Sequence, residues 1–180
     1  LANEATAWGF GADLSIPLTV TPSTYPANDS AAMTAMAGIG QASVKATPLQ
    51  MAMVAATVAN KGKQMRPYLV ASTMDADLNT ISSTTPSVLR EPIDEATAAS
   101  LSTMMQQVVS SGTATSAQVA GVQVAGKTGT AETGSDEGGP TSWFIGFAGT
   151  DLSRPTIALA VVLDGGQQTT QGLRNVSTRR

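Results

Sequence analysis

The feature that most constrains the fold is a change of hydrophobic period near residue 120. Before it, apolar side chains recur at helical spacing in two segments, which begin after Thr47 and after Asp94. After it, they alternate along Val122 to Glu132, Trp143 to Gly149 and Thr156 to Asp164. A period of 3.6 is typical of an amphipathic helix, and a period of 2 is typical of a half-buried strand. Helices followed by a three-strand antiparallel meander predict an α+β fold rather than a doubly wound sheet.

The first predicted helix begins with a capping-box pattern, in which Thr47 and Gln50 would satisfy each other's main-chain N–H groups. Pro48 suits the first helical position, and Gly62 supplies a stop signal after the last apolar residue. Because the helix between them is apolar almost all round, we expect it to be buried.

The second predicted helix lies between an N-cap at Asp94 and Gly112. Short β-prone stretches at Tyr68 to Met74 and Val88 to Arg90 flank a polar turn and predict a small hairpin or an irregular connection before it. The helix is amphipathic and should lie on the core. Its expected apolar face consists of Ala98, Leu101, Met105 and Val108.

The chain divides into four predicted parts. Residues 1–37 are mostly loop with a short helix at Ala31 to Ala37, 38–120 form the helical part, 121–165 form the meander, and 166–180 form a solvated tail. A loop rich in glycine and acidic residues, 134–140, separates the first two strands. Trp143 and Phe144 are expected in the core on opposite faces of the sheet.

Composition excludes several kinds of chemistry. The chain contains neither histidine nor cysteine, which rules out a Ser-His-Asp triad, a cysteine nucleophile and any histidine or thiolate metal site. The net charge is −3 and only 13% of residues are charged, which argues against nucleic-acid binding. The longest apolar run, Ile157 to Leu163, is far shorter than the roughly 20 residues that cross a bilayer. We predict neither a cofactor nor a metal.

The stretch Gly126 to Glu132 carries the candidate chemistry. On a strand, Thr128 and Thr130 share one face while Lys127 and Gly129 share the other. The glycines leave room for a ligand or a second backbone, and an unpaired main-chain N–H at such an edge can serve an oxyanion hole. Two hydroxyls and an ammonium suit an anionic substrate. The alternative, a solvated edge lysine that discourages strand addition, is equally compatible with the residues.

A rival motif overlaps this stretch. Gly121 to Thr128 matches G-x-x-x-x-G-K-T, and Ile157 to Leu163 followed by Asp164 imitates a magnesium-binding strand end. A phosphate-binding loop, however, runs directly into a helix whose N-terminal amides hold the phosphates. Five glycine and proline residues between Gly129 and Pro140 disfavour a helix there, and with it nucleotide hydrolysis.

Lys127-Thr128-Gly129-Thr130 resembles the third active-site motif of the penicillin-binding transpeptidases and serine β-lactamases. Flanking stretches, in order, strengthen this resemblance: Gly38-Ile39-Gly40-Gln41, Ala46-Thr47-Pro48-Leu49-Gln50-Met51-Ala52, Ala59-Asn60-Lys61-Gly62, Gly112-Thr113-Ala114 and Trp143-Phe144-Ile145-Gly146-Phe147. From Gly38 to Asp164 the chain is similar to the C-terminal half of the transpeptidase domain of a class B, monofunctional penicillin-binding protein of the A type.

The resemblance implies a serine D,D-transpeptidase of peptidoglycan cross-linking that β-lactams acylate and inhibit, with an antiparallel sheet packed by helices and incomplete in this chain. Lys127 would support proton movement and carboxylate binding. The Thr128 and Thr130 hydroxyls, on either side of Gly129, would bind the substrate carboxylate. The main-chain N–H of Thr130 would complete the oxyanion hole. The implied catalytic residues are therefore Lys127 and Thr130, and the implied substrate-binding residues are Thr128, Gly129 and Thr130.

The family's other two motifs, Ser-x-x-Lys and Ser-x-Asn, do not occur in this sequence. The residues three places before the four lysines are Ala42, Val58, Asn60 and Val124. The resemblance therefore implies that the nucleophilic serine and its activating lysine lie upstream of Leu1, and that the chain begins partway through the domain.

The resemblance also implies partners and a location. The expected partners are the peptidoglycan stem peptide, β-lactams, the upstream part of the same domain, and proteins of cell division or elongation, but no nucleic acid. The expected location is the extracytoplasmic face of the cell membrane, with an N-terminal anchor outside this chain. A non-catalytic sensor of penicillin or cell-wall peptides and a serine β-lactamase remain open as alternatives.

Overall fold

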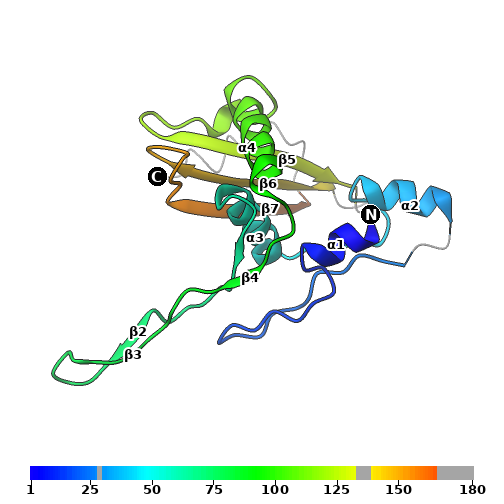
Figure 1. The fold of residues 1–180 in the computed structure, drawn as a ribbon. Helices are drawn as coiled ribbons and strands as arrows, with labels where there is room; N and C mark the ends of the chain where they lie inside the picture. Colours follow the sequence, from blue (N-terminus) through cyan, green and yellow to red (C-terminus); the bar gives the residue numbers. More distant parts are fainter. Residues whose placement is uncertain (28–29, 133–138, 166–180) are drawn as a thin grey trace.

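The computed structural model describes residues 1–27, 30–132 and 139–165 (Figure 1). Its helices are α1 (Ala2–Ala7), α2 (Ala31–Gly38), α3 (Pro48–Ala59), α4 (Glu95–Ser110) and the 3-10 turn η1 (Thr115–Ala117). Its strands are β1 (Gln64–Met65), β2 (Ser72–Met74), β3 (Thr80–Ser83), β4 (Val88–Arg90), β5 (Gln123–Ala131), β6 (Gly139–Gly149) and β7 (Ile157–Gly165). Of the predicted loop 134–140, only Gly139 and Pro140 are described, as the start of β6, and the predicted tail 166–180 lies outside the described residues.

The three long strands form the predicted antiparallel meander in the order β5-β6-β7. Their register pairs Lys127 with Ile145 and Thr128 with Phe144. Within the described part of the chain, β6 is the central strand, so one edge of β5 and one edge of β7 carry no strand partner. The edge of β5 is the one that concerns the candidate site.

One face of the sheet is covered by α3 and α4, which Figure 1 shows crossing the strands side by side. Val58 of α3 and Met105 of α4 pack there against Ala125 and Phe147, which lie opposite each other on β5 and β6. The Phe147 side chain is only 1% exposed. Burying a phenylalanine side chain contributes about 1.5 to 3 kcal/mol, so this cluster fixes β5 against both helices.

The other face of the sheet packs around Phe144, which contacts Val109 and Ala114 at the end of α4. Its ring lies over a pair of glycines, Gly126 and Gly146, that face each other across β5 and β6. A Cβ atom at Gly126 would lie 2.4 Å from the Phe144 ring, and one at Gly146 would lie 2.6 Å from a main-chain oxygen. The glycines are therefore required by packing.

The start of α3 follows half of the predicted capping box. The Thr47 hydroxyl accepts a hydrogen bond from the Gln50 main-chain N–H at 3.2 Å, as predicted. The reciprocal bond is wrong, because the Thr47 N–H donates to the Ser23 hydroxyl and the Gln50 amide donates to the Trp8 carbonyl. Sequence-distant segments thus replace the local partner. They tie the first 25 residues to the end of α3 that faces the candidate site.

Helix α4 begins where predicted, at the N-cap Asp94, whose carboxylate accepts from the Thr97 main-chain N–H at 2.7 Å. This hydrogen bond to the charged form lowers the pKa of Asp94 below its ordinary value. The predicted apolar face needs one correction: Val109 is buried, whereas Val108 is half-buried. Because the end of α4 packs against Phe144, Val109 is the residue that enters the core there, one position after the predicted Val108.

The predicted single hairpin is wrong in part. Val88–Arg90 is a strand, β4, but it pairs with β1, and the polar stretch expected as a turn forms β3, which pairs with β2. Residues 68–88, called the arm below, are all exposed and project from the body of the molecule in Figure 1. Across the arm, the hydroxyls of Thr73 and Ser82 lie 2.7 Å apart and form a hydrogen bond.

The first 37 residues contain a helix that the sequence pattern does not predict. Helix α1 has no side-chain cap and no apolar period; the Trp8 indole N–H instead donates to the Glu4 carboxylate along it. Helix α2 confirms the helix expected at Ala31 to Ala37. Among all described helices, none combines the length and the apolar character that crossing a bilayer demands.

Candidate functional site

Strand β5 places the sequence-predicted site residues in one extended segment. Lys127, Thr128, Gly129 and Thr130 all lie within Gln123–Ala131, paired without interruption to β6. No helix begins at Thr128, so the segment does not have the geometry of a phosphate-binding loop. The overlap with that nucleotide-binding motif is therefore accidental.

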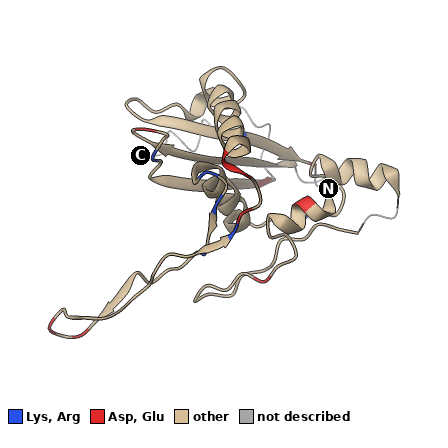
Figure 2. Ribbon diagram, viewed as in Figure 1, with Lys and Arg blue, Asp and Glu red and all other residues tan. Residues whose placement is uncertain are grey.

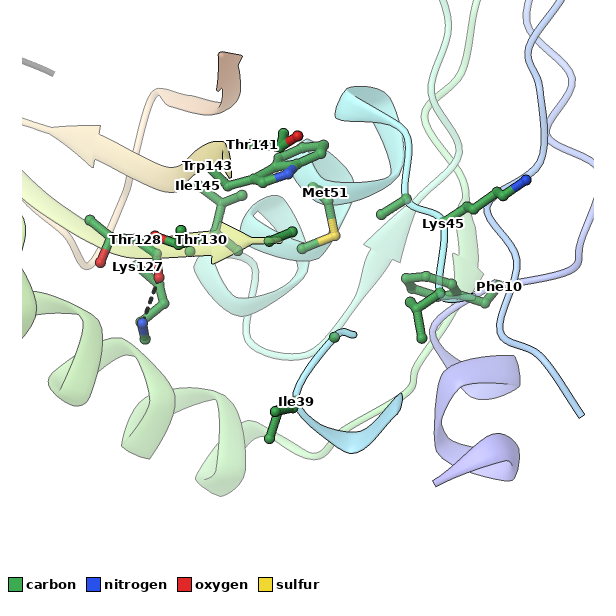
Figure 3. A pocket seen from close by; sticks show the side chains of 15 residues that line it. Phe10, Ile39, Lys45, Met51, Lys127, Thr128, Thr130, Thr141, Trp143 and Ile145 are labelled. Atoms are coloured by element: carbon green, nitrogen blue, oxygen red, sulfur yellow. Dashed lines mark hydrogen bonds between the residues drawn. The ribbon is translucent and has the colours of Figure 1, made fainter. Parts of the chain in front are cut away.

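A pocket of about 540 Å³ opens beside this strand (Figure 3). One wall is β5 from Lys127 to Ala131, and the adjoining wall is formed by Thr141, Trp143 and Ile145 of β6. Figure 3 shows Met51 of α3 next to these strands and Phe10 and Ile39 on the opposite side of the pocket. All four predicted site residues thus line one cavity.

Lys127 is exposed, and its ammonium donates to the main-chain carbonyl of Thr128 at 2.6 Å. The three strands of the sheet carry only one other charged residue, Asp164, whose carboxylate already accepts from the Thr141 hydroxyl at 2.8 Å. Figure 2 shows how sparse charges are around the sheet. Lys45 also lines the pocket, but its side chain extends away from β5 in Figure 3. The cationic character of the β5 wall therefore comes from Lys127.

Thr128 is half-buried, and its hydroxyl lies 2.6 Å from the hydroxyl of Thr113. Thr113 belongs to the turn that follows α4. The turn and the strand therefore meet at the residue whose hydroxyl is predicted to bind a carboxylate. Thr130, by contrast, is exposed near the end of the strand, and it lines the pocket.

The two glycines of the motif have different functions. Of the two uses expected of Gly126, the ligand is excluded, because the Phe144 ring fills that space, whereas the close approach of a second backbone is confirmed: an added Cβ would lie 2.9 Å from the Ile145 main-chain oxygen. At Gly129, the nearest atom to an added Cβ would be the Cβ of Trp143 at 3.5 Å, an ordinary contact. Gly129 therefore borders the open pocket. Glu132, just after β5, is exposed.

Trp143 and Phe144 lie on opposite faces, as predicted, but only Phe144 belongs to the core. Trp143 is half-buried and lines the pocket. Sequence reasoning also gives no site role to Phe10, Met51 or Thr113. Phe10 and Met51 reach the pocket only through tertiary packing, which no local pattern reports. For Thr113 the sequence does offer an indication, because Gly112-Thr113-Ala114 is one of the stretches that resemble the family.

Within the part of the chain that the structure describes, no cluster of three or more histidine, cysteine, aspartate or glutamate residues could hold a metal ion. The groups that line the β5 wall are hydroxyls, main-chain amides and an ammonium. Such a set binds an anion through hydrogen bonds and charge.

Comparison with known proteins identifies the family of the chain. The model of the penicillin-binding protein transpeptidase domain matches residues 1–178. The chain therefore belongs to the penicillin-binding protein transpeptidase domain family, and its α+β architecture, with helices packed on an antiparallel sheet, is that family's fold.

Among individual proteins, the chain is similar to the peptidoglycan D,D-transpeptidase PbpA of Mycolicibacterium smegmatis, with 44% identity over 169 residues, 91% of this chain and 34% of that protein. The crystal structure of PBPA from Mycobacterium tuberculosis superimposes with a TM-score of 0.81 at 37% identity, over 93% of this chain and 38% of that one. A penicillin G acyl-enzyme complex of the same M. tuberculosis protein superimposes with a TM-score of 0.80 at 38% identity, over 92% and 37%. The chain spans about a third of the length of the curated relatives.

Proposed function

We propose that this chain forms the carboxylate-binding and oxyanion-stabilising wall of a serine D,D-transpeptidase that cross-links peptidoglycan and is acylated by β-lactams. The observation that carries the proposal is the β5 wall: Lys127, Thr128 and Thr130 along one pocket edge. Family membership supports it, and so do the relatives named peptidoglycan D,D-transpeptidase and the penicillin G acyl-enzyme of one of them.

The carboxylate of a stem peptide's D-alanine end, or of a penicillin, fits the charge and hydrogen-bonding capacity of this wall. A carboxylate accepts hydrogen bonds only, whereas the Thr128 and Thr130 hydroxyls and the Lys127 ammonium can all donate. Hydrogen bonds between charged partners contribute about twice as much as neutral ones. Lys127 is the only cation on the three strands, all of which lie within the described residues. The one carboxylate on these strands, Asp164, accepts from the Thr141 hydroxyl.

The N–H of Thr130 is suited to an oxyanion hole. In an antiparallel strand, the main-chain groups of alternate residues point to the same side. The Thr128 carbonyl receives the Lys127 ammonium, so the Thr130 N–H lies on the same side of β5 as that bonded carbonyl. Because β5 is rigidly paired to β6, this donor is fixed in advance, which is the condition for stabilising a developing negative charge.

The nucleophile comes, in this proposal, from polypeptide outside these 180 residues. The sequence contains no Ser-x-x-Lys and no Ser-x-Asn, and the curated relatives are about three times as long. The serine oxygen would add to the carbonyl carbon and give a tetrahedral oxyanion. Collapse would form the serine ester and break the bond to the departing nitrogen, which takes up the proton released by serine; a second stem peptide's amine would then displace the serine. Such a reaction takes place at the extracytoplasmic face of the membrane.

The test is acylation of the full-length protein by a fluorescent penicillin, measured as a second-order rate constant. Lys127→Ala should lower this rate at least about 100-fold, in the range found for groups that move protons or hold a developing charge. Lys63→Ala, at an exposed lysine far from the pocket lining, is the matched control and should react like the wild type.

Acylation that is absent in the wild type, or that is unchanged by Lys127→Ala, would contradict the proposal. The rate at which the acylated protein loses its label distinguishes the open alternatives: release within seconds indicates a β-lactamase, whereas a persistent adduct agrees with a transpeptidase. Incorporation of a labelled D-amino acid or stem peptide into peptidoglycan by the full-length protein then separates a transpeptidase from a non-catalytic sensor.

A further inference from the structure

The contact between Thr113 and Thr128 has no part in the function proposed so far. Their hydroxyl oxygens lie 2.6 Å apart, which is hydrogen-bond distance. We propose that Thr113 is a positioning residue: its hydroxyl donates to Thr128 and thereby directs the single Thr128 hydroxyl proton toward the carboxylate of the acyl donor. This inference rests on the proposed function, because it assumes that Thr128 binds that carboxylate.

The main chain around Thr113 is held on both sides. The N–H groups of Gly112 and Ala114 both donate to the Val108 carbonyl, at 3.1 and 3.0 Å. Ala114 is fully buried in the Phe144 cluster. A Cβ at Gly112 would lie 2.8 Å from the Val108 Cα, so only glycine allows the turn to pass this close to α4. Thr113 is thus a side chain on a fixed support, although it is itself exposed.

The number of available protons determines which hydroxyl must donate. Each threonine hydroxyl has one proton and two lone pairs, and a carboxylate can only accept. If Thr128 donated to Thr113, it would have no proton left for the substrate. Binding of a carboxylate therefore selects the arrangement in which Thr113 donates to Thr128 and Thr128 donates to the ligand. Consecutive hydrogen bonds of this kind polarise one another, which strengthens the bond from Thr128 to the charged ligand.

The position of Thr113 also explains why the contact is specific to this part of the strand. Thr128 is half-buried and lies next to α4, whereas Thr130 is exposed two residues further along β5. Only the first of the two threonines therefore meets the turn after α4. Thr113 should therefore orient the hydroxyl of Thr128 and not that of Thr130.

The experiment measures the second-order rate of acylation of the full-length protein by benzylpenicillin. Thr113→Val should lower the rate by up to about tenfold, the upper end of the effect of losing one hydrogen bond between neutral groups. Thr113→Ser keeps the hydroxyl and should stay within about twofold of the wild type. Thr115→Val, at an exposed threonine two residues along the same loop, is the matched control and should also leave the rate unchanged.

A double-variant cycle separates positioning from a general effect on folding. In a Thr128→Val background, adding Thr113→Val should change the rate by less than about twofold, because the partner through which Thr113 acts is already gone. Equal slowing by Thr113→Val in both backgrounds, or a Thr113→Ser variant as slow as Thr113→Val, would overturn the inference. So would a Thr113→Val variant that reacts like the wild type.

These failures are distinguishable from failure of the proposed function. If the wild type is acylated and Lys127→Ala is slow, but Thr113→Val reacts normally, only the positioning role is lost. If the wild type is not acylated, both the proposed function and the role of Thr113 are overturned. The thermal unfolding midpoint of each variant shows whether a change in rate arises from misfolding.

Discussion

Two hydroxyl pairs in this molecule have almost the same oxygen–oxygen separation, but the main chain that holds them differs in burial. Thr113 and Thr128 lie 2.6 Å apart beside the pocket, and Thr73 and Ser82 lie 2.7 Å apart on the arm. In the first pair, Thr113 directly precedes buried Ala114 and Thr128 lies opposite buried Phe144 on the next strand, whereas every residue of the arm, 68–88, is exposed. A hydrogen bond in water contributes little by itself, so the buried support is what makes the first pair able to orient a ligand.

The largest expected effect is on the support itself. Phe147→Ala should lower the free energy of unfolding by about 3 to 5 kcal/mol, because it opens a cavity where β5 and β6 meet both helices. Ile81→Ala on the arm, where the side chain is 69% exposed, should change it by less than about 0.5 kcal/mol. Chemical denaturation of the full-length variants measures both. Similar decreases in the free energy of unfolding for Phe147→Ala and Ile81→Ala would show that the arm is as tightly packed as the sheet.

The next effect concerns the turn that holds Thr113. Gly112→Ala should cost about 1 to 3 kcal/mol, since the new Cβ would meet the Val108 main chain at 2.8 Å and the turn must move away from α4. Acylation by penicillin should slow as well, because Thr113 moves with the turn. Gly121→Ala, outside the pocket lining, is a contrasting variant: the positive φ of 75° strains the new residue, yet no atom lies within 4 Å of the added Cβ. Its effect should be on stability alone. An unchanged acylation rate in Gly112→Ala would show that the position of the turn does not affect the site.

A smaller effect depends on pH. The hydrogen bond from the Thr97 main-chain N–H lowers the pKa of Asp94, and hydrogen bonds from Asn79 lower the pKa of Asp75 in the turn of the arm. A carboxylate with a lowered pKa stabilises the folded state above its unfolded pKa, and that stabilisation disappears as the pH falls through the folded value.

The thermal midpoint of the wild type should therefore exceed that of Asp94→Asn at pH 7, and the gap should close as the pH falls below about 4. Asp75→Asn should leave the midpoint unchanged at every pH, because the exposed arm can open locally without unfolding the body. A pH-dependent shift in Asp75→Asn as large as that in Asp94→Asn would mean that the arm unfolds together with the core.

The smallest effect is expected for the hydroxyl pair of the arm. Thr73→Val removes a hydrogen bond that closely matches the Thr113–Thr128 bond in length, but it should change neither the acylation rate nor the thermal midpoint. Acylation kinetics of Thr73→Val beside Thr113→Val make the comparison direct. A slowed Thr73→Val variant would show that the arm communicates with the pocket.

Local sequence patterns predicted most of what lies close in the chain. The alternation after residue 120 gave the three strands, and the caps at Thr47 and Asp94 gave the starts of α3 and α4. The motif at Lys127 gave the strand that lines the pocket. These features depend on periodicity and on contacts within a few residues, which a sequence displays directly.

The remainder depends on contacts between distant segments. The Gln50 amide binds the Trp8 carbonyl, 42 residues away, in place of its expected local partner. The Phe144 ring occupies the space beside Gly126, where either a ligand or a second backbone was expected. Thr113 meets Thr128 only because α4 packs against β5. No local pattern encodes these three contacts. The contacts at Gly126 and Thr128 both involve the strand that carries the candidate site.

The central claim is that the edge of β5 holds the carboxylate of an acyl donor whose carbonyl is attacked from elsewhere. A crystal structure of the full-length protein acylated by benzylpenicillin tests it most directly. We expect the penicillin carboxylate within about 3 Å of the Thr128 and Thr130 hydroxyls, the acyl oxygen on the Thr130 N–H, and the ester on a serine outside these 180 residues. An ester on a serine within the chain, or a carboxylate bound away from β5, would contradict the account.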